Sequence, residues 1–505
     1  MSFYITTPIY YVNAAPHLGH AYTTIAADVM ARHHRQRGEE VFFLTGTDEH
    51  GEPVADAAHA LGVEPQELAD RNAERFRALA PQLGASNDFF IRTTDKPHEA
   101  IVQEVLSRVR DAGYVYKGTY EGWYCPRCAD FKADNEIDEG NRCPIHHIEL
   151  TREQEDNYFF RLSDFQDRLE ALYAEREDFV APRTRYNEAL SFIRSGLRDV
   201  PLTRHKLTWG VQVPWDHEHV FYVWFDALLN YYSALRYARE GEDLTARLWP
   251  PDYHLIAKDI LRFHTVYWPA LLLAAGLELP KHMFVHGYLL LEGEKMSKSL
   301  GNVLDPFEVI DRFGADALRF YLLRDVSFGQ DGSVSTAAFE LRYETELANE
   351  LGNLANRTIS MLLRYRDGVV APLELDPELA VDFAGLPEQV GAQIDRAELT
   401  VALEEIWQRV RRLNRYVEER APFRLAKDED AAEELSAVLA NLAEGLRTVT
   451  VLLWPYLPAS AEKLLEALGA PDTSLVGAAF GSGSIERVTA IPALFPKDAA
   501  APQPS

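Results

Sequence analysis

Cysteine is scarce in this chain, and basic residues are outnumbered by acidic ones. Only three cysteines occur in 505 residues, and an odd number within one short stretch argues against the disulfide framework of a secreted protein. The 51 Lys and Arg residues face 78 Asp and Glu residues, which gives a formal net charge of −27. Any nucleic acid must therefore be bound through a local basic patch.

Long apolar runs are missing as well. No stretch approaches the roughly 20 consecutive apolar residues that cross a bilayer, and the segment after Met1 begins as a strand and not as a secretory signal. With 47% hydrophobic and 26% charged residues, the composition is typical of a soluble globular chain that is long enough for three or four domains. We expect a cytoplasmic protein without membrane association.

The first hundred residues alternate strand-like and helix-like patterns. The segment FYITTPIYY (3–11) is rich in β-branched and aromatic residues, and 19–37 has apolar residues at helical spacing. A second strand, EEVFFLTGTDEHG (39–51), precedes a second helical stretch at 65–83. This alternation predicts a parallel sheet covered by helices, with ligands bound beyond the carboxyl ends of its strands.

The rest of the chain divides by composition. After the first hundred residues, aromatic, cysteine-bearing and turn-rich sequence interrupts the alternation of strands and helices, and the α/β pattern then returns. From Ser335 onward the apolar residues have helical spacing, over 336–366, 384–420 and 429–469. The expected domains are two halves of an α/β domain (1–114 and 208–270), an insertion between them (115–207), a region that contains the loop EGEKMSKSLGN (271–340), a helical bundle (341–485) and a tail (486–505).

The stretch PHLGH (16–20) lies where the first strand should turn into a helix. Alone it is a weak signal, and two half-exposed histidines are the plainer interpretation. It lacks the glutamate of the metalloprotease motif HExxH. However, a small residue such as Gly19 at a helix start lets a phosphate approach the backbone N–H groups, and His17 and His20 could donate hydrogen bonds to that phosphate.

A second phosphate-directed element is KMSKS (295–299). Lysine–serine loops are common on solvated surfaces, but this string following PHLGH is specific. The pair resembles the HIGH and KMSKS signatures of class I aminoacyl-tRNA synthetases. Further segments are similar to the methionyl-tRNA synthetases, over residues 3 to about 497, and include TTPIYYVNAAPHLGH, FLTGTDEHG, YVWFDALLNY, IAKDILRFH, ELGNLANR and NRYVEERAPF.

The three cysteines lie in two short turns, CPRC (125–128) and CPIH (143–146). Reduced core thiols are the alternative interpretation, but they would not place every cysteine in paired C-P-x-C and C-P-x-H turns. The pattern predicts one tetrahedral, closed and therefore structural zinc. His147 competes for the fourth position but breaks the symmetry of the spacing. The expected ligands are Cys125, Cys128, Cys143 and His146, and the resemblance is to the single-knuckle form of the family.

The resemblance implies a fold and a two-step reaction. The fold is a Rossmann-like parallel-sheet catalytic domain that is split by the zinc-knuckle insertion. A stem-contact region with the KMSKS loop (271–340) and an all-α anticodon-binding bundle (341–485) follow it. L-Methionine and ATP would give methionyl-adenylate and pyrophosphate, and the acyl group would pass to the 3′ end of tRNA(Met). Magnesium would accompany ATP. We expect the enzyme to be a monomer.

The resemblance also assigns site residues. ATP would contact His17, Gly19, His20, Asp259, Lys295 and Lys298, and the two histidines and two lysines would be catalytic. The ammonium of methionine would pair with Asp48, for which a helix cap is the alternative role. The other methionine-binding residues would be Ile9, Tyr11, Trp224, Ala227, Leu228, Tyr231, Ile260 and His264, which without the resemblance are plain core positions. Ala257 departs from the family, which usually has a glycine there that lets adenine lie close to the backbone.

The basic run RVRRLNRYVEER (409–420) could offset the acidic net charge locally. Its arginines at 409, 411, 412 and 415 can contact tRNA phosphates, or they can form a solvated, salt-bridged helix face. By resemblance, Asn353 and Arg357 would reach the anticodon bases. Phe423 would stack on a base where the family often has tryptophan.

Other synthetases fit this sequence less well. Leucyl, isoleucyl and valyl synthetases need a larger editing insertion than 115–207, and a cysteinyl enzyme would hold zinc inside its pocket. A degenerate synthetase paralogue that binds tRNA or a partner without catalysis is the remaining alternative. The intact signature residues His17, His20, Asp48, Lys295 and Lys298 argue against it.

Overall fold

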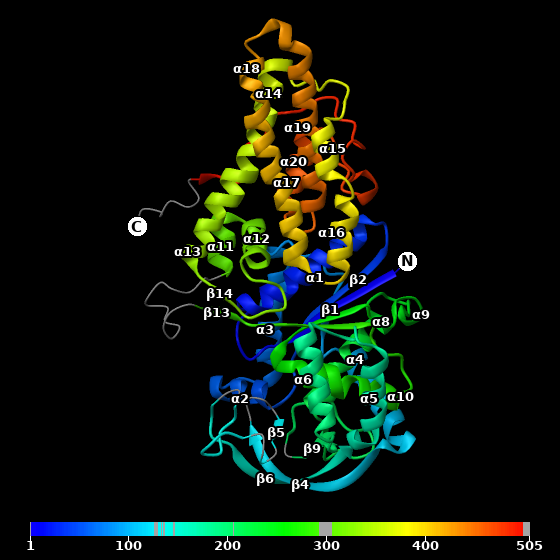
Figure 1. Cartoon of the computed structure of the whole chain (residues 1–505). Helices are drawn as coiled ribbons and strands as arrows, with labels where there is room; N and C mark the ends of the chain where they lie inside the picture. The colour runs from blue at the N-terminus through cyan, green and yellow to red at the C-terminus, as the bar shows by residue number, and fades with distance from the viewer. Residues whose placement is uncertain are drawn as a thin grey trace.

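The structure is a computed structural model of the chain. It describes residues 2–125, 130–132, 134, 137–144, 147–205, 207–291 and 306–497. Four of the predicted site residues lie outside the described residues: Cys128, His146, Lys295 and Lys298. Figure 1 shows three stacked parts, with a small antiparallel sheet at one end, a larger sheet in the middle and a helical bundle at the other end.

The central sheet is wholly parallel, which confirms the prediction from the alternating pattern. Its strand order is β3-β2-β1-β11-β12-β7. Chain order reverses between β1 and β11, and such a switch point opens a crevice at the carboxyl ends of the strands. The strands are β1 (Ser2–Tyr11), β2 (Glu40–Asp48), β3 (Phe89–Arg92), β7 (Val180–Ala181), β11 (Tyr253–Ala257) and β12 (His282–His286).

Two details of this sheet were not expected. The β1–β2 register shifts between Thr6 and Ile9, where Pro8 has no N–H to give to the ladder. Strand β7 comes from inside the segment expected to be an insertion, yet it pairs with β12 at the sheet edge. The expected boundaries 115 and 207 therefore do not coincide with the limits of the central sheet.

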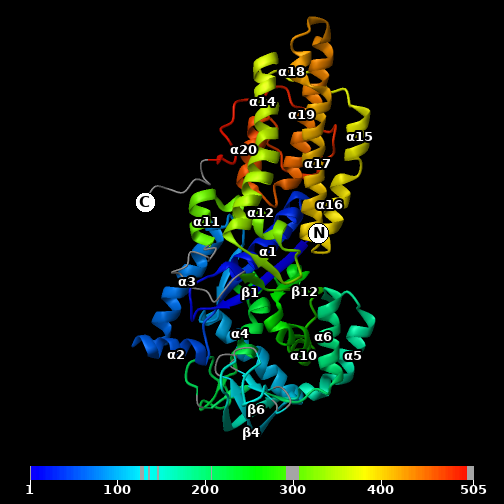
Figure 2. The same cartoon turned by 60° about the vertical axis from the view of Figure 1, so that its left-hand side comes forward.

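Four other strands of the insertion form a separate antiparallel sheet, in the order β5-β4-β6-β8. Figures 1 and 2 place this sheet at the end of the molecule opposite the bundle. Its strands are β4 (Val115–Cys125), β5 (Asp130–Lys132), β6 (Thr151–Phe160) and β8 (Val200–Pro201).

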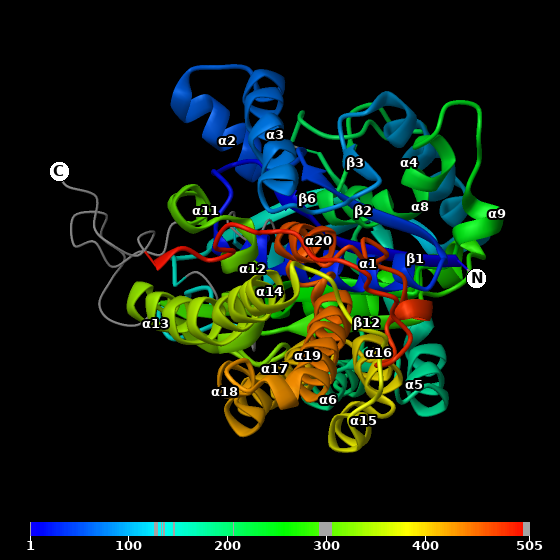
Figure 3. The ribbon, with the colours of Figure 1, turned by 90° about the horizontal axis from the view of Figure 1, so that it is seen from above.

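Helix α1 (Leu18–Gln36) connects the sheet to the bundle. Nearly all its side chains are buried, because β1 and β2 cover one side of it while α12 (Ala315–Asp325) and α16 (Leu386–Asp395) pack against the other. Viewed from above, in Figure 3, the bundle helices lie in front of α1 and β1. The first turn of α1 reaches the crevice of the sheet, and the rest of α1 lies against the helical domain.

A buried ion pair fixes α1 to the helical domain. Arg319 Nη2 on α12 lies 2.7 Å from Asp28 Oδ2 on α1, and both side chains are 0% exposed. Arg319 also donates to the carbonyl oxygens of Tyr456, Pro455 and Leu83. Burial alone would raise the pKa of Asp28, but Arg319 and Arg32 hold it below its usual value. The charge is thus fully compensated.

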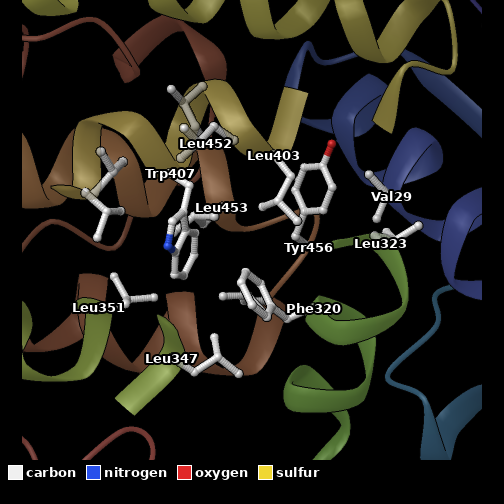
Figure 4. Close-up of a cluster of buried hydrophobic side chains, with 14 of the residues drawn as sticks. Val29, Phe320, Leu323, Leu347, Leu351, Leu403, Trp407, Leu452, Leu453 and Tyr456 are labelled. Carbon is white, nitrogen blue, oxygen red and sulfur yellow. The ribbon is translucent and has the colours of Figure 1, made fainter. Parts of the chain in front are cut away.

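The bundle has one continuous apolar core with α1 and α12. Figure 4 shows Trp407 of α17 facing Phe320 of α12. Tyr456, and Val29 from α1, lie in the same cluster. The bundle helices confirm the expected helical region, although it contains more breaks than expected. They include α14 (Asn353–Arg366), α17 (Leu399–Arg420), α19 (Ala432–Leu453) and α20 (Pro458–Ala467).

Within the described residues, one helix, Glu429–Leu453, is long and apolar enough to cross a membrane by length and composition, with a mean hydropathy of 1.3. However, 89% of its apolar window is buried inside the protein, where it packs against α14 and α17. The core helix of a soluble protein passes the same test.

Candidate active site

A cavity of about 1060 Å³ opens at the switch point between β1 and β11. It is lined from β1, the start of α1, the end of β2, α7 (Val223–Leu228) and the turn after β11, and residues such as Lys132 and Pro144 reach it from the insertion. Thirteen residues predicted from the sequence line this one cavity: Ile9, Tyr11, His17, Gly19, His20, Asp48, Trp224, Ala227, Leu228, Tyr231, Asp259, Ile260 and His264.

The PHLGH stretch forms the N-terminal cap of α1. His17 is the capping residue, and its Nδ1 accepts from the Gly19 N–H at 3.1 Å, while Nδ1 of His20 accepts from the His17 N–H at 3.1 Å. The two rings stack with centroids 3.7 Å apart. A Cβ at Gly19 would lie 3.0 Å from the His17 ring, so glycine gives this cap its room.

This capping fixes what the two histidines can do. Burial lowers the pKa of His17, and burial together with His17 lowers that of His20, so both rings are neutral at neutral pH. Because each Nδ1 accepts a hydrogen bond, the ring proton is on Nε2. Both side chains are therefore N–H donors at a helix N-terminus, where anions bind.

Asp48, at the end of β2, is a buried carboxylate that forms no ion pair with any residue that the structure describes. It is 2% exposed, and its Oδ1 and the nearby Tyr11 hydroxyl have no hydrogen-bond partner among the described residues. Burial, Asp226 and Glu49 raise its pKa well above the usual value. Helix α2 (Glu52–Leu61) is preceded by Gly51 and has no side-chain cap, so the structure does not support the alternative role of Asp48 as a helix cap.

The opposite wall of the cavity is aromatic and uncharged. Trp224 stacks on Phe263 with ring centroids 3.8 Å apart and an interplanar angle of 9°. His264 Nδ1 lies 3.0 Å from the Ile260 carbonyl and must donate to it, so Nε2 accepts from the Tyr231 hydroxyl at 2.8 Å. Burial lowers the pKa of His264 to about 4, which keeps the wall neutral.

Two contributions to this site were missed from the sequence. Phe263 lies next to His264 in the IAKDILRFH segment, and its aromatic character was the available signal. Lys258 beside Ala257 bonds Asp331 Oδ2 at 2.6 Å, and its ammonium lies 4.2 Å from the Tyr288 ring centroid. No signal in the sequence linked Lys258 to a residue so far along the chain.

The family model described as "tRNA synthetases class I (M)" matches residues 3–155 and 140–359. The "Methionine--tRNA ligase" of Caldanaerobacter subterraneus subsp. tengcongensis is 47% identical over 93% of this chain and 74% of its own length. The Bacillus subtilis protein of the same name is 43% identical over 98% of this chain and 78% of its own length.

This chain belongs to the methionine–tRNA ligase family. The solved structure "Mycobacterium tuberculosis methionyl-tRNA synthetase in complex with methionyl-adenylate" matches it with a TM-score of 0.93 and 42% identity, over 98% of this chain and 99% of that one. The chain is accordingly a class I aminoacyl-tRNA ligase.

The expected zinc site of this methionine–tRNA ligase is described only in part. Cys125 and Cys143 are both 0% exposed and share a small apolar cluster with Leu150. Within the described ranges no group of three or more His, Cys, Asp or Glu is arranged to hold a metal, but Cys128 and His146 lie outside those ranges. The side chain of His147, the competing ligand, is 75% exposed.

The arginine run of the bundle is mostly a salt-bridged helix face, which is the second of the two uses that the sequence left open. Arg409 bonds Glu405 and the Asp382 carbonyl. Arg411 bonds Glu404, and Arg412 contacts three carboxylates, which belong to Glu378, Asp382 and Glu419. Arg415 is exposed and has no ion-pair partner in the part of the chain that the structure describes.

The three predicted anticodon residues lie on the bundle surface. Asn353 is exposed, and Arg357 bonds Glu418 at 2.9 Å. Phe423 is 39% exposed on α18 (Pro422–Leu425). Figures 1 and 2 place α18 toward the end of the bundle far from the central sheet.

Proposed function

We propose that this chain activates L-methionine with ATP and transfers the methionyl group to the 3′ end of tRNA(Met). The observation that carries the proposal is the combination, in one cavity, of a neutral aromatic wall and a buried carboxylate whose Oδ1 has no hydrogen-bond partner among the described residues. An amino acid with an uncharged, polarisable side chain satisfies both. Asp48 would receive its ammonium, and the restored ion pair would offset the cost of burying the carboxylate.

The aromatic wall suits the thioether of methionine. Sulfur makes favourable contacts with aromatic rings, worth about 0.3–1.5 kcal/mol each, and Trp224, Tyr231 and His264 supply the rings. Because His264 is neutral and already bonded to Tyr231, it presents no charge to the sulfur. Ile9, Tyr11, Ala227, Leu228 and Ile260 complete the proposed methionine site.

The nucleotide would lie on the α1 side of the cavity. The Nε2 donors of His17 and His20 would bond the phosphates of ATP over Gly19, and Asp259 would lie near the ribose. Lys295 and Lys298 would neutralise charge that develops on the departing pyrophosphate. Magnesium would be held mainly by the phosphates. These residues orient the reactants and stabilise charge, and none forms a covalent intermediate.

We further propose one structural zinc, held by Cys125, Cys128, Cys143 and His146. The burial of two thiols beside one another in one apolar cluster supports it, and so does the exposure of His147, since ligands of a closed site are buried. Purified protein should contain about one equivalent of zinc. A Cys143→Ala variant that keeps full zinc would refute the assignment, and His147→Ala, which should keep it, is the matched control.

In the bundle, we propose that Asn353, Arg357 and Phe423 read the anticodon. Their common exposure on the bundle surface supports this role. We also propose that the enzyme works as a monomer in the cytoplasm.

The deciding experiment is ATP–pyrophosphate exchange scanned over all twenty amino acids. We expect exchange with methionine alone among good substrates, followed by charging of tRNA(Met). Lys295→Ala and Lys298→Ala should lower the adenylation rate far more than they weaken methionine binding. A chain that binds tRNA(Met) without exchange would instead be the degenerate paralogue.

A further inference from the structure

Behind the cavity lies a buried group of four polar side chains whose centre is Asp226. Both carboxylate oxygens of Asp226 accept a hydrogen bond: Oδ2 lies 2.7 Å from His50 Nδ1, and Oδ1 lies 2.8 Å from His98 Nε2. His98 Nδ1 lies 2.6 Å from the Ser233 hydroxyl. All four residues are at most 3% exposed. Asp226 is absent from the cavity lining, so it does not touch a ligand there.

These four residues connect the segments that build the methionine site. His50 follows Asp48 by two positions in the loop after β2. Asp226 is on α7 between the wall residues Trp224 and Ala227. His98 is on α4 (Lys96–Val109) and Ser233 on α8 (Asn230–Tyr237). The Asp226 carboxylate therefore joins the loop that follows Asp48 to the helix that carries the opposite wall.

The buried carboxylates of this region, Asp48, Glu49 and Asp226, differ in how their charge is compensated. Glu49 is paired with Arg92, whose Nε and Nη2 donate to it at 2.7 and 2.8 Å. Burial alone would raise the pKa of Asp226, but His50 and His98 hold it below its usual value. Asp226 is thus a stabilised anion, and it acts on Asp48, whose pKa it raises. A cation brought to Asp48 is attracted by both charges.

We propose that Asp226, clamped by His50 and His98, is a positioning residue for the ammonium subsite of methionine. Its bond to His50 holds the loop that directly follows Asp48, its bond to His98 holds the Asp226 carboxylate in place from α4, and its negative charge raises the pKa of Asp48. The inference rests on the proposed function, but it concerns residues to which that function assigns no role. If wild-type exchange with methionine fails, the proposed function fails before any variant is tested.

The two histidines use different ring nitrogens, which allows a crossed test. The amide nitrogen of asparagine can replace Nδ1, whereas that of glutamine can replace Nε2. His50→Asn and His98→Gln should therefore keep the bond to Asp226 and a methionine KM within about threefold of wild type. His50→Gln and His98→Asn should raise that KM roughly tenfold or more, since each loses a charge-assisted hydrogen bond.

In all four variants kcat and the KM for ATP should stay near wild type, because Asp226 does not contact the reacting atoms. If side-chain volume alone matters, the same amide, asparagine or glutamine, will give the lower methionine KM at both position 50 and position 98. That result would overturn the proposal. A loss in kcat without a change in methionine KM would also overturn it.

A second measurement isolates the ammonium. L-Methioninol and 4-(methylthio)butan-1-ol differ by the amine alone, and both can compete with methionine. In His50→Gln and His98→Asn, inhibition by methioninol should weaken about tenfold, while inhibition by the amine-free alcohol should not change. Equal weakening of both inhibitors would mean that the cluster supports the whole pocket, and would also overturn the proposal.

Discussion

The active-site cavity and the helical bundle treat charge in opposite ways. In the bundle, Arg412 contacts three carboxylates at 2.6–3.2 Å, and at its base Arg319 is compensated by Asp28 and three carbonyl oxygens. In the cavity, Asp48 is as deeply buried as these groups, yet its Oδ1 has no partner among the described residues. Each part of the chain follows one physical rule, that a buried charge needs a partner.

The difference shows where a partner must come from outside. A fully compensated charge stabilises the chain and has no capacity left for a ligand. A buried charge that the chain leaves uncompensated lowers stability until a ligand arrives. The arginine run looked like the nucleic-acid signal in the sequence, but it is mainly structural, whereas one aspartate in TDEHG marks the site. The predictions below test this contrast.

Arg319→Met should give the largest effect. It leaves the Asp28 carboxylate buried and unpaired, which costs about 3–5 kcal/mol in the unfolding free energy. Urea unfolding followed by circular dichroism measures this change. The double variant Asp28→Asn with Arg319→Met should recover part of the loss, because no uncompensated charge remains. A single variant as stable as wild type would remove the assigned role of this ion pair.

Asp48→Asn should have the opposite pattern, with lost activity and gained stability. Removing one partner of a buried charge pair costs about 2–5 kcal/mol, which corresponds to about 30-fold to several thousand-fold in kcat/KM for methionine. ATP–pyrophosphate exchange measures this loss in kcat/KM for methionine. Loss of exchange with a KM for methionine equal to that of wild type would argue against an ammonium contact.

The difference in unfolding free energy between wild type and Asp48→Asn should depend on pH. The pKa of Asp48 is raised in the folded chain, whereas in the unfolded chain the group titrates near about 3.9. The folded chain therefore holds this proton to higher pH, so the wild type loses stability as pH rises from about 4 through the folded pKa. The variant should be more stable than wild type near about pH 8 and not near about pH 4. A variant less stable than wild type at the higher pH would contradict this.

The sequence predicted local structure and motifs better than long-range pairing. The strand and helix periods of the first fifty residues were sufficient for the β1–α1–β2 unit, and the quoted motifs were sufficient for the thirteen cavity residues. Strand β7 was missed because a strand of two residues, Val180 and Ala181, is too short to show an alternating pattern. The expected helix 384–420 is interrupted at Ala397, whose φ of 57° is left-handed, and no glycine marked that turn.

The pairing of Asp28 with Arg319 and of Asp226 with His50 and His98 could not be predicted either. These partners are far apart in sequence, and each is an ordinary polar residue in its own segment. Only the packed fold decides which of them meet. For the same reason the sequence left both uses of the arginine run open.

Phe423→Ala tests the exposed end of the bundle. Stacking of a base on an aromatic ring is worth about 1–3 kcal/mol, so aminoacylation of tRNA(Met) should fall by about 5- to 150-fold in kcat/KM. Exchange without tRNA should stay near wild type, because α18 lies at the end of the bundle away from β1 and α1 in Figure 2, and β1 and α1 line the cavity. Phe423→Trp is the control and should restore charging. Equal loss in both assays would mean that Phe423 supports only the fold.

The smallest effect should separate two arginines of the same helix. Arg412→Ala removes a cation from three carboxylates and should lower the unfolding free energy by about 1–2 kcal/mol, with little change in tRNA affinity. Arg415→Ala should leave stability unchanged, because its side chain is exposed and has no ion-pair partner among the described residues.

Arg415 lies one helical turn from Glu418, which bonds the proposed anticodon residue Arg357. A phosphate contact there would be lost in Arg415→Ala, and the slope of log affinity for tRNA(Met) against log salt would become shallower by about 0.7–0.9. Filter binding at several salt concentrations measures this slope. If Arg412→Ala changed the slope and Arg415→Ala did not, compensated charges would be binding the ligand, and the contrast between cavity and bundle would fail.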